Sequence, residues 1–252
     1  MATVNCKAKK VESTKYYKLL SSYTTNGSFN LSIPEDGIYY VEMYGGGGGA
    51  SQRLATDAYA GKTYGHCYSG GSGSCFKGLL ELTTGNYAIQ VGQKGNRITG
   101  GTIDTRSNGG DTIFPNYVTA KGGIGAYITS VATVTGAASG EQGYGGEVEI
   151  INSEKVQGLR CAGNDGHKSP SAGTGTIVAP VYPQSWGGFS VYDNTYTGYG
   201  AGGGNKASNS AYDAVAGAFL IYKESTSSDF TLKIVIQNIF GFYKSGNYYC
   251  AK

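Results

Sequence analysis

Alternating apolar and polar positions predict β-strands along most of this chain. In residues 28–33, SFNLSI, the apolar side chains Phe29, Leu31 and Ile33 occupy every second position, which is typical of a half-buried strand. No segment longer than about ten residues keeps the 3.6-residue period of a helix. We therefore expect an all-β fold, with strands at residues 28–33, 38–44, 75–82, 87–91, 216–222 and 230–236.

Short turns between these strands predict two hairpins. Residues 28–33 and 38–44 are joined by Pro34–Gly37, whose proline and glycine suit a tight turn. Residues 75–82 and 87–91 are joined in the same way. We expect each pair to be antiparallel neighbours in one sheet.

Glycine runs follow the predicted strands. The chain has 43 glycines in 252 residues, and five of them, Gly45, Gly46, Gly47, Gly48 and Gly49, are consecutive. Such a run does not suit a strand or helix interior, because glycine loses the most backbone entropy and has no side chain to pack. The chain has only 5 prolines and lacks a G-X-Y repeat, which excludes collagen. Its 22 tyrosines and 8 phenylalanines provide enough apolar side chains to form a buried core. We predict a β-framework that carries a glycine-rich layer.

The domain organisation is predicted from where the strand pattern fades. Residues 1–22 are mixed and polar, and we interpret them as an attachment arm or a short helical piece. We expect residues 23–252 to form a single glycine-rich domain, since an all-β domain of this length is common. Turn residues recur too often at about 126–210 for long strands, so this part is expected to be an irregular insertion.

Charge and hydrophobicity exclude several partners. A formal charge of +3, without a stripe of lysine and arginine, does not predict nucleic-acid binding. The first 20 residues contain no signal-peptide core, and no apolar run approaches the roughly 20 residues of a membrane span. The composition nevertheless resembles that of extracellular proteins. We expect a protein that is made in the cytoplasm, released by lysis and located on the virion surface, without membrane insertion.

Five cysteines leave at least one thiol without an intrachain partner. Cys6 and Cys250 lie near the two ends of the chain, where a disulfide would close one subunit or join two. The alternative is that the cysteines are free buried thiols in a reducing compartment.

The order of the motifs resembles a known family. SFNLSIPEDGIYYVEMYGGGGGA, FKGLLELTTGNYAIQVGQKG, GGDTIF, AKGGIGA, EQGYGG, GYGAGGG and AGAFLIY follow one another as in the glycine-rich domain of phage tail-fibre and adhesin proteins. A similar plan occurs in the extracellular glycine-rich region of the anaplastic lymphoma kinase family. The resemblance implies a jelly-roll-like or TNF-like β-sandwich with packed polyglycine helices, which are left-handed with three residues per turn. It also implies a structural role for Gly45–Gly49.

Candidate catalytic and metal sites are weak. G-x-G-x-x-G at residues 198–203 has no flanking strand, helix and acidic residue at the required spacing. Glu147 and Glu149 fall on one face of a short strand, where exposed carboxylates are usual. The histidines and cysteines lack zinc-ligand spacing. We therefore expect no enzyme activity, no cofactor and no metal.

A series of aromatic residues in the irregular part is the candidate ligand-binding site. Rings interleaved with asparagine, serine and glycine suit both recognition surfaces and stacking on sugars. The alternative is that they cover the glycine layer as local core. The series consists of Tyr182, Trp186, Phe189, Tyr192, Tyr196 and Tyr199.

Together, the resemblance and the composition predict a non-enzymatic phage virion structural protein. It would be a homo-oligomeric tail or head fibre component that contacts other virion proteins and binds a host-surface glycan or protein. The alternative is a self-assembling extracellular filament or spore-surface subunit, cross-linked through Cys6 and Cys250.

Overall fold

The computed structural model describes residues 12–56, 63–99, 105–131, 138–166, 198–206, 210–211, 213–237, 242–245 and 248–251. These residues form strands and no α-helix, so the prediction of an all-β fold is confirmed. A membrane-spanning helix is accordingly not found in the described ranges. The chain divides into two compact units, Ser21–Ile221 and Met1–Leu20 with Tyr222–Lys252.

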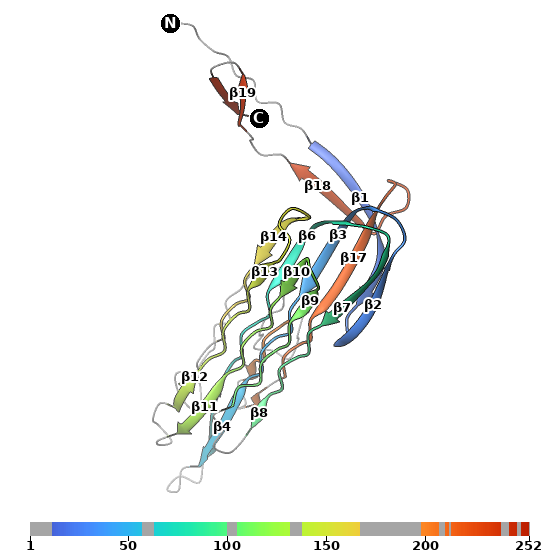
Figure 1. Ribbon diagram of the computed structural model, residues 1–252. Helices are drawn as coiled ribbons and strands as arrows, with labels where there is room; N and C mark the ends of the chain where they lie inside the picture. Colours follow the sequence, from blue (N-terminus) through green and yellow to red (C-terminus); the bar gives the residue numbers. More distant parts are fainter. Residues whose placement is uncertain are drawn as a thin grey trace, which may run out of the picture. The chain divides into compact units, whose positions relative to one another are not determined.

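Two sheets form a β-sandwich in the unit Ser21–Ile221 (Figure 1). The strands that this unit contributes to the first sheet, in spatial order, are β14 (Val156–Cys161), β6 (Cys75–Leu82), β3 (Gly37–Tyr44) and the first part of β17 (Ala218–Ser225). Those of the second are β13 (Val148–Ile150), β10 (Val118–Ala120), β9 (Thr112–Phe114), β7 (Gly85–Val91) and β2 (Gly27–Ile33).

The core of this unit lies between the two sheets. Phe114 of β9 meets Phe219 of β17 edge to face, with ring centroids 5.4 Å apart. The predicted alternation holds in β2, β3 and β7, whose buried positions are every second residue, although Ile38 at the start of β3 is exposed. The largest fully buried side chains include Leu31, Ile33, Tyr39, Met43, Phe76, Leu80, Leu82 and Ile89.

The two predicted hairpins are wrong. β3 pairs with β6, and β2 pairs with β7, so each short turn carries the chain from one sheet to the other. The two crossings are bonded to each other: Thr84 donates its backbone N–H to Asp36 Oδ1 at 2.7 Å and its hydroxyl to the Ile33 carbonyl at 3.1 Å. The alternation of apolar residues identifies the buried face of a strand but not the strand that pairs with it. For this reason the sequence pattern predicted the wrong strand pairs.

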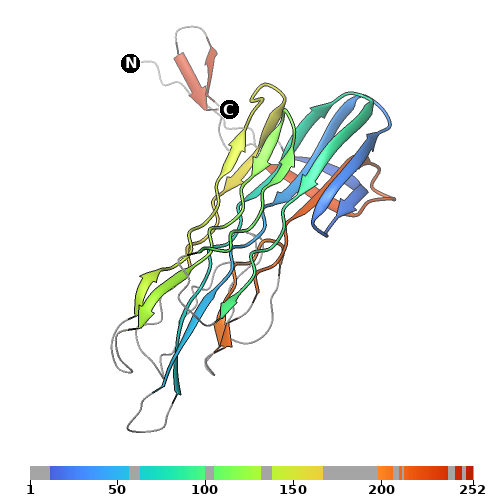
Figure 2. The same ribbon diagram turned by 60° about the horizontal axis from the view of Figure 1, so that its bottom comes forward.

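Beyond the sandwich, nine extended segments of the described chain run side by side as a glycine lattice (Figure 2). All but segment 200–204 adjoin a sandwich strand at one end. Backbone hydrogen bonds connect them instead of strand ladders. The segments are residues 45–50, 69–74, 92–97, 107–111, 121–126, 142–147, 162–166, 200–204 and 213–217.

Segment 45–50 is the centre of the lattice, with six neighbours. Its amides donate, at 2.8–2.9 Å, from Gly45 and Gly48 to segment 69–74, from Gly46 and Gly49 to segment 107–111, and from Gly47 to segment 213–217. Its carbonyls accept, at 2.7–2.9 Å, from segments 121–126 and 200–204 and from Gly95 and Ile98. The partner repeats every third residue, which is the period of a polyproline II helix, a conformation without internal hydrogen bonds.

Only glycine fits at the centre of the lattice. A Cβ atom added at any position of Gly45–Gly49 would lie 1.8–2.4 Å from a backbone atom of a neighbouring segment. Real carbon atoms do not approach so closely, so any side chain here would push the segments apart. The backbone approach that forms the hydrogen bonds therefore requires the run of five glycines.

Short sheets occupy the far end of the same unit, directly after the lattice segments (Figure 1). β11 lies beside both β4 and β5, and the buried residues Tyr68, Ala126 and Ile128 form a small core there. The stretch expected to be irregular thus contains paired strands. The strands are β4 (Ser51–Thr56), β5 (Thr63–Tyr68), β8 (Ile98–Thr99), β11 (Tyr127–Val131), β12 (Ala138–Glu141), β15 (Asn205–Lys206) and β16 (Ser210–Ala211).

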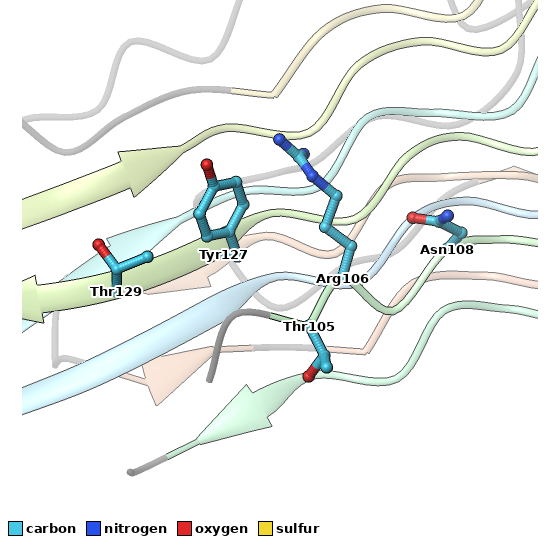
Figure 3. A pocket seen from close by; sticks show the side chains of 5 residues that line it. All are labelled: Thr105, Arg106, Asn108, Tyr127 and Thr129. Atoms are coloured by element: carbon cyan, nitrogen blue, oxygen red, sulfur yellow. The ribbon is translucent and has the colours of Figure 1, made fainter. Parts of the chain in front are cut away.

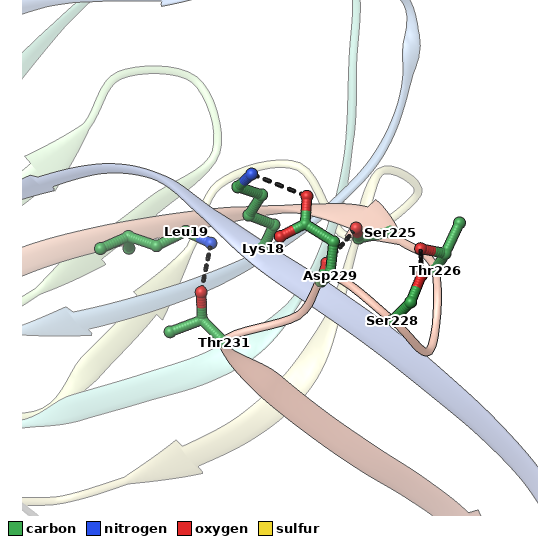
Figure 4. Close-up of polar contacts among 7 residues, drawn as sticks. All are labelled: Lys18, Leu19, Ser225, Thr226, Ser228, Asp229 and Thr231. Atoms are coloured by element: carbon green, nitrogen blue, oxygen red, sulfur yellow. Dashed lines mark hydrogen bonds and ion pairs between the residues drawn. The ribbon is translucent and has the colours of Figure 1, made fainter.

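The second unit contains the antiparallel pair of β1 (Glu12–Tyr23) and β18 (Leu232–Gln237), and the hairpin of β19 (Phe242–Ser245) and β20 (Tyr248–Ala251). The turn before β18 is tied to β1, as Figure 4 shows. Lys18 Nζ lies 2.7 Å from Asp229 Oδ2, and the Leu19 N–H donates to Thr231 Oγ1 at 3.2 Å. Residues 12–22 of β1 belong to the predicted attachment arm, and they form a strand and not a helical piece. The attachment role stays a prediction.

Candidate functional site

A shallow, wide-open surface hollow of about 650 Å³ lies where the lattice meets the far-end sheets. Two stretches of chain line it: residues 105–108, which lead into lattice segment 107–111, and the start of β11. Figure 3 shows the Arg106 side chain beside the Tyr127 ring. The lining residues are Thr105, Arg106, Asn108, Tyr127 and Thr129.

Arg106 is fixed by contacts from three directions. Its Nη1 donates to the carbonyls of Gly125 at 2.7 Å and Gln142 at 3.1 Å, and its Nη2 forms an ion pair with Glu141. The guanidinium also lies 4.5 Å from the centroid of the Tyr127 ring and 5.5 Å from that of Tyr144. A planar guanidinium held by such contacts is well suited to order the tyrosine rings around it.

Asn108 is oriented by the lattice itself. Its Oδ1 accepts a hydrogen bond from the Gly125 N–H at 2.9 Å, so its amide nitrogen is directed away from this bond. Thr105 and Asn108 are exposed, whereas Arg106 and Tyr127 are half-buried. The hollow thus offers an amide donor, hydroxyl groups and the rim of an aromatic ring on a fixed backbone.

The five lining residues include no carboxylate, imidazole or thiol. Hydroxyl, amide and guanidinium groups form hydrogen bonds with a polar ligand, and an aromatic ring supplies apolar contact. This arrangement suits recognition of a hydroxyl-rich ligand. Among the described residues, no group of three or more His, Cys, Asp or Glu side chains is placed to hold a metal ion.

Of the predicted aromatic site, only Tyr199 lies within the described residues. It is half-buried and packs against Tyr44 with ring centroids 5.5 Å apart, beside Cys75 and Cys161 on the outer face of the first sheet. Its place is thus at the sandwich and not at the hollow. The other members, Tyr182, Trp186, Phe189, Tyr192 and Tyr196, lie outside the described residues, and their role stays a prediction.

The remaining candidates from the sequence are dispersed. Cys6 lies outside the described residues, and Cys250 is part of β20, opposite Tyr243, so the disulfide between them stays a prediction. The G-x-G-x-x-G stretch runs into lattice segment 200–204, where the Gly203 N–H donates to the Gly48 carbonyl at 2.7 Å. Glu149 lies 3.3 Å from Lys121 Nζ, in an exposed ion pair.

Sequence reasoning missed the residues of the hollow and of its support. Arg106, Asn108, Tyr127, Glu141 and Tyr144 come from separate parts of the chain and match no motif. The sequence did contain one indication of the site, because Arg106 is an isolated cation between glycine-rich stretches. The tyrosines, however, reach Arg106 only through the packing of the lattice segments. The site could not be assembled from spacing alone.

Comparison with known proteins agrees with the geometry. The family model described as a glycine-rich domain matches residues 24–225, which include the sandwich strands β2–β17 and the lattice segments. A search of curated proteins finds no match to this sequence. Because the family model spans most of the chain, this protein belongs to the glycine-rich domain family.

Proposed function

We propose that this protein is a non-enzymatic phage virion structural protein, a tail or head fibre component that binds a glycan or protein on the host surface. The observation that carries the proposal is the glycine lattice. Its central segment is bonded to six neighbours, so the far-end hairpins β4–β5 and β11–β12 rest on a rigid base. A rigid base that presents short hairpins suits display for binding, because it lowers the entropy cost of association.

The hollow at Arg106 supplies a contact surface for this function. Saccharides present hydroxyl groups together with apolar ring faces, and both kinds of group have partners here. Tyr127 is held by Arg106, and Asn108 is held by the lattice, so neither side chain has to be ordered on binding. A host-surface saccharide is therefore the ligand class that the hollow fits best.

The assembly follows from the same proposal. The protein forms a homo-oligomer on the virion surface, docks to other virion proteins through its first residues and presents the far-end hairpins outward. The rings of Tyr182, Trp186, Phe189, Tyr192, Tyr196 and Tyr199 form a second contact with the host in this proposal.

A matched pair of variants tests the hollow on a glycan array with the full-length protein. Asn108→Asp keeps the oxygen that accepts the Gly125 N–H but replaces the amide donor by a negative charge. Asn152→Asp is the control, because Asn152 Oδ1 likewise accepts backbone N–H groups, from Glu154 and Lys155, in a turn of the sandwich. We expect Asn108→Asp to weaken saccharide binding about tenfold or more and Asn152→Asp to leave it unchanged. Equal binding by both variants would exclude the hollow.

The aromatic series has its own test. Trp186→Ala should abolish adsorption to host cells, and unchanged adsorption would show that these rings do not contact the host.

Electron microscopy with non-reducing electrophoresis distinguishes the fibre from the filament alternative. Discrete particles and a single small oligomer support a fibre component. Long regular filaments and a disulfide ladder would replace the proposal with self-assembly.

A further inference from the structure

Two cysteines lie opposite each other on neighbouring strands of the first sheet, where these strands pass into the lattice. Cys75 is the first residue of β6, Cys161 is the last residue of β14, and the two are direct partners in the antiparallel register. Both are buried and both are free thiols in this structure. Ser74 and Ala162, the residues beside them, already belong to the lattice segments.

The strand register places this pair within disulfide geometry. Direct partners on antiparallel strands have Cα atoms about 4.5–5.5 Å apart, and disulfides span about 4.4–6.8 Å. The register is continuous from Val156 opposite Leu80 to the cysteine pair, so the backbone holds this spacing without a bulge. The two side chains belong to the same buried cluster. A bond between the sulfur atoms therefore needs side-chain rotation but no change in the sheet.

The two thiols differ in reactivity. Burial raises the pKa of both thiols, that of Cys75 to about 12, and the Lys77 ammonium opposes the rise at both. The neighbouring thiol lowers the pKa of Cys161 and raises that of Cys75. Cys161 is also the more exposed, at 8% against 1%. It is thus the first thiol to ionise and the first that a reagent reaches.

We propose that Cys75 and Cys161 form a cross-strand disulfide when the protein meets a low-molecular-weight disulfide such as oxidised glutathione. The Cys161 thiolate attacks one sulfur of that reagent and releases its first thiol. Cys75 then loses its proton and attacks the Cys161 sulfur, which releases the second thiol. The two cysteines lose two electrons and two protons, and the reagent is reduced to two thiols. The rate rises with pH, because each attack needs a thiolate.

The cross-link would tie β6 to β14 at the point where both strands pass into the lattice. Just beyond the two cysteines, lattice segments 69–74 and 162–166 are already joined: Ser72 donates its N–H to the Asn164 carbonyl at 2.9 Å and accepts the Asn164 N–H on its hydroxyl at 2.7 Å. Hydrogen bonds of this kind open when the strands fray, whereas a covalent bond does not. The disulfide closes residues 75–161 into a loop and so also restricts the unfolded chain.

Peptide mass spectrometry tests the proposal on the full-length protein. The protein is incubated with oxidised glutathione, alkylated without reduction and digested with trypsin, which places Cys75 with Cys67 on residues 63–77 and Cys161 on residues 161–168. We expect these two peptides to be linked in the wild type and in the control Cys67→Ser, and to be separate in Cys75→Ser. Alkylated or glutathione-capped Cys75 and Cys161 in the wild type would overturn the proposal, as would a link that persists in Cys75→Ser.

Thermal unfolding gives a second readout. The oxidised protein should unfold roughly 5–10 °C above the reduced protein. The difference should vanish on reduction and be absent in Cys161→Ser, while Cys67→Ser retains it. A linked peptide without any such shift would mean that the disulfide forms but does not lock the junction.

Discussion

Thr112 donates its hydroxyl to the carbonyl of Tyr44 at 2.6 Å, where β3 passes into the central glycine run. The same oxygen accepts the Gly92 N–H at 3.0 Å, and Thr112 is fully buried. One side chain of β9 thus satisfies backbone groups at the ends of β3 and β7, which belong to opposite sheets. The junction between sandwich and lattice depends on this hydroxyl.

Replacing that hydroxyl should be costly. Thr112→Val keeps the shape of the side chain but leaves the Tyr44 carbonyl and the Gly92 N–H buried without this partner. We expect a loss of about 2–4 kcal/mol in the free energy of unfolding, measured by urea denaturation. Thr112→Ser keeps the hydroxyl and should lose less than half as much. Equal losses in the two variants would show that the methyl group contributes as much to stability as the hydrogen bonds of the hydroxyl.

Adding a single methyl group at the centre of the lattice should destabilise the fold. A Cβ atom at Gly47 would lie 1.8 Å from the Ala201 carbonyl oxygen, so Gly47→Ala must move a backbone segment. We expect a destabilisation of about 3 kcal/mol or more, or failure to fold. Gly37→Ala is the matched control, since its nearest atom would be a Tyr39 ring carbon at 3.9 Å. A stable Gly47→Ala protein with unchanged thermal unfolding would contradict the packed lattice.

The turn between β9 and β10 depends on Asn116. Asn116 has φ 67°, follows Pro115 and precedes Tyr117, whose N–H donates to the Phe114 carbonyl at 3.1 Å. Proline followed by a residue with positive φ is typical of a type II turn. Asn116→Ala should cost about 1 kcal/mol in urea unfolding, while Asn116→Gly should be neutral or slightly stabilising. A larger loss for the glycine variant would show that the asparagine side chain itself is required.

Asp213 should make stability depend on pH. Hydrogen bonds from Lys94, at 2.9 Å, and from the Arg97 N–H, at 3.0 Å, lower the pKa of this carboxyl from 3.8. Because the pKa is lower in the folded state, the carboxylate stabilises the fold above pH 3.8, and this contribution disappears as the pH falls through the folded-state pKa. At pH 7 the wild type should therefore resist urea better than Asp213→Asn.

The comparison at low pH provides the check. Below the folded-state pKa both proteins carry a neutral side chain at position 213, so their urea midpoints should converge. Carboxyl NMR shifts of Asp213 should place its midpoint below that of an unstructured aspartate. A difference between wild type and variant that stays constant from pH 7 to pH 2.5 would rule out the ion pair as its source.

The far-end hollow illustrates how little of the candidate site could be predicted. Tyr127 and Tyr144 are ordinary tyrosines in the sequence, and Arg106 is an isolated cation. They meet because segments 107–111, 121–126 and 142–147 are neighbours in the lattice. The predicted aromatic series was instead chosen from local composition, and its one described member, Tyr199, packs at the sandwich.

The sequence by itself indicated six of the strands, at residues 28–33, 38–44, 75–82, 87–91, 216–222 and 230–236, because alternation along a strand depends only on the two-residue period of its side chains. It did not indicate β1, β4, β5, β11, β12 or β14. It also determined that residues 45–49 need an unusual structure, since a run of glycines is excluded from ordinary elements. Tertiary structure alone decided the partners: β3 with β6 and not with β2, and six neighbours around segment 45–50. A polyproline II segment makes no hydrogen bonds within itself, so its partners exist only after distant segments have packed together.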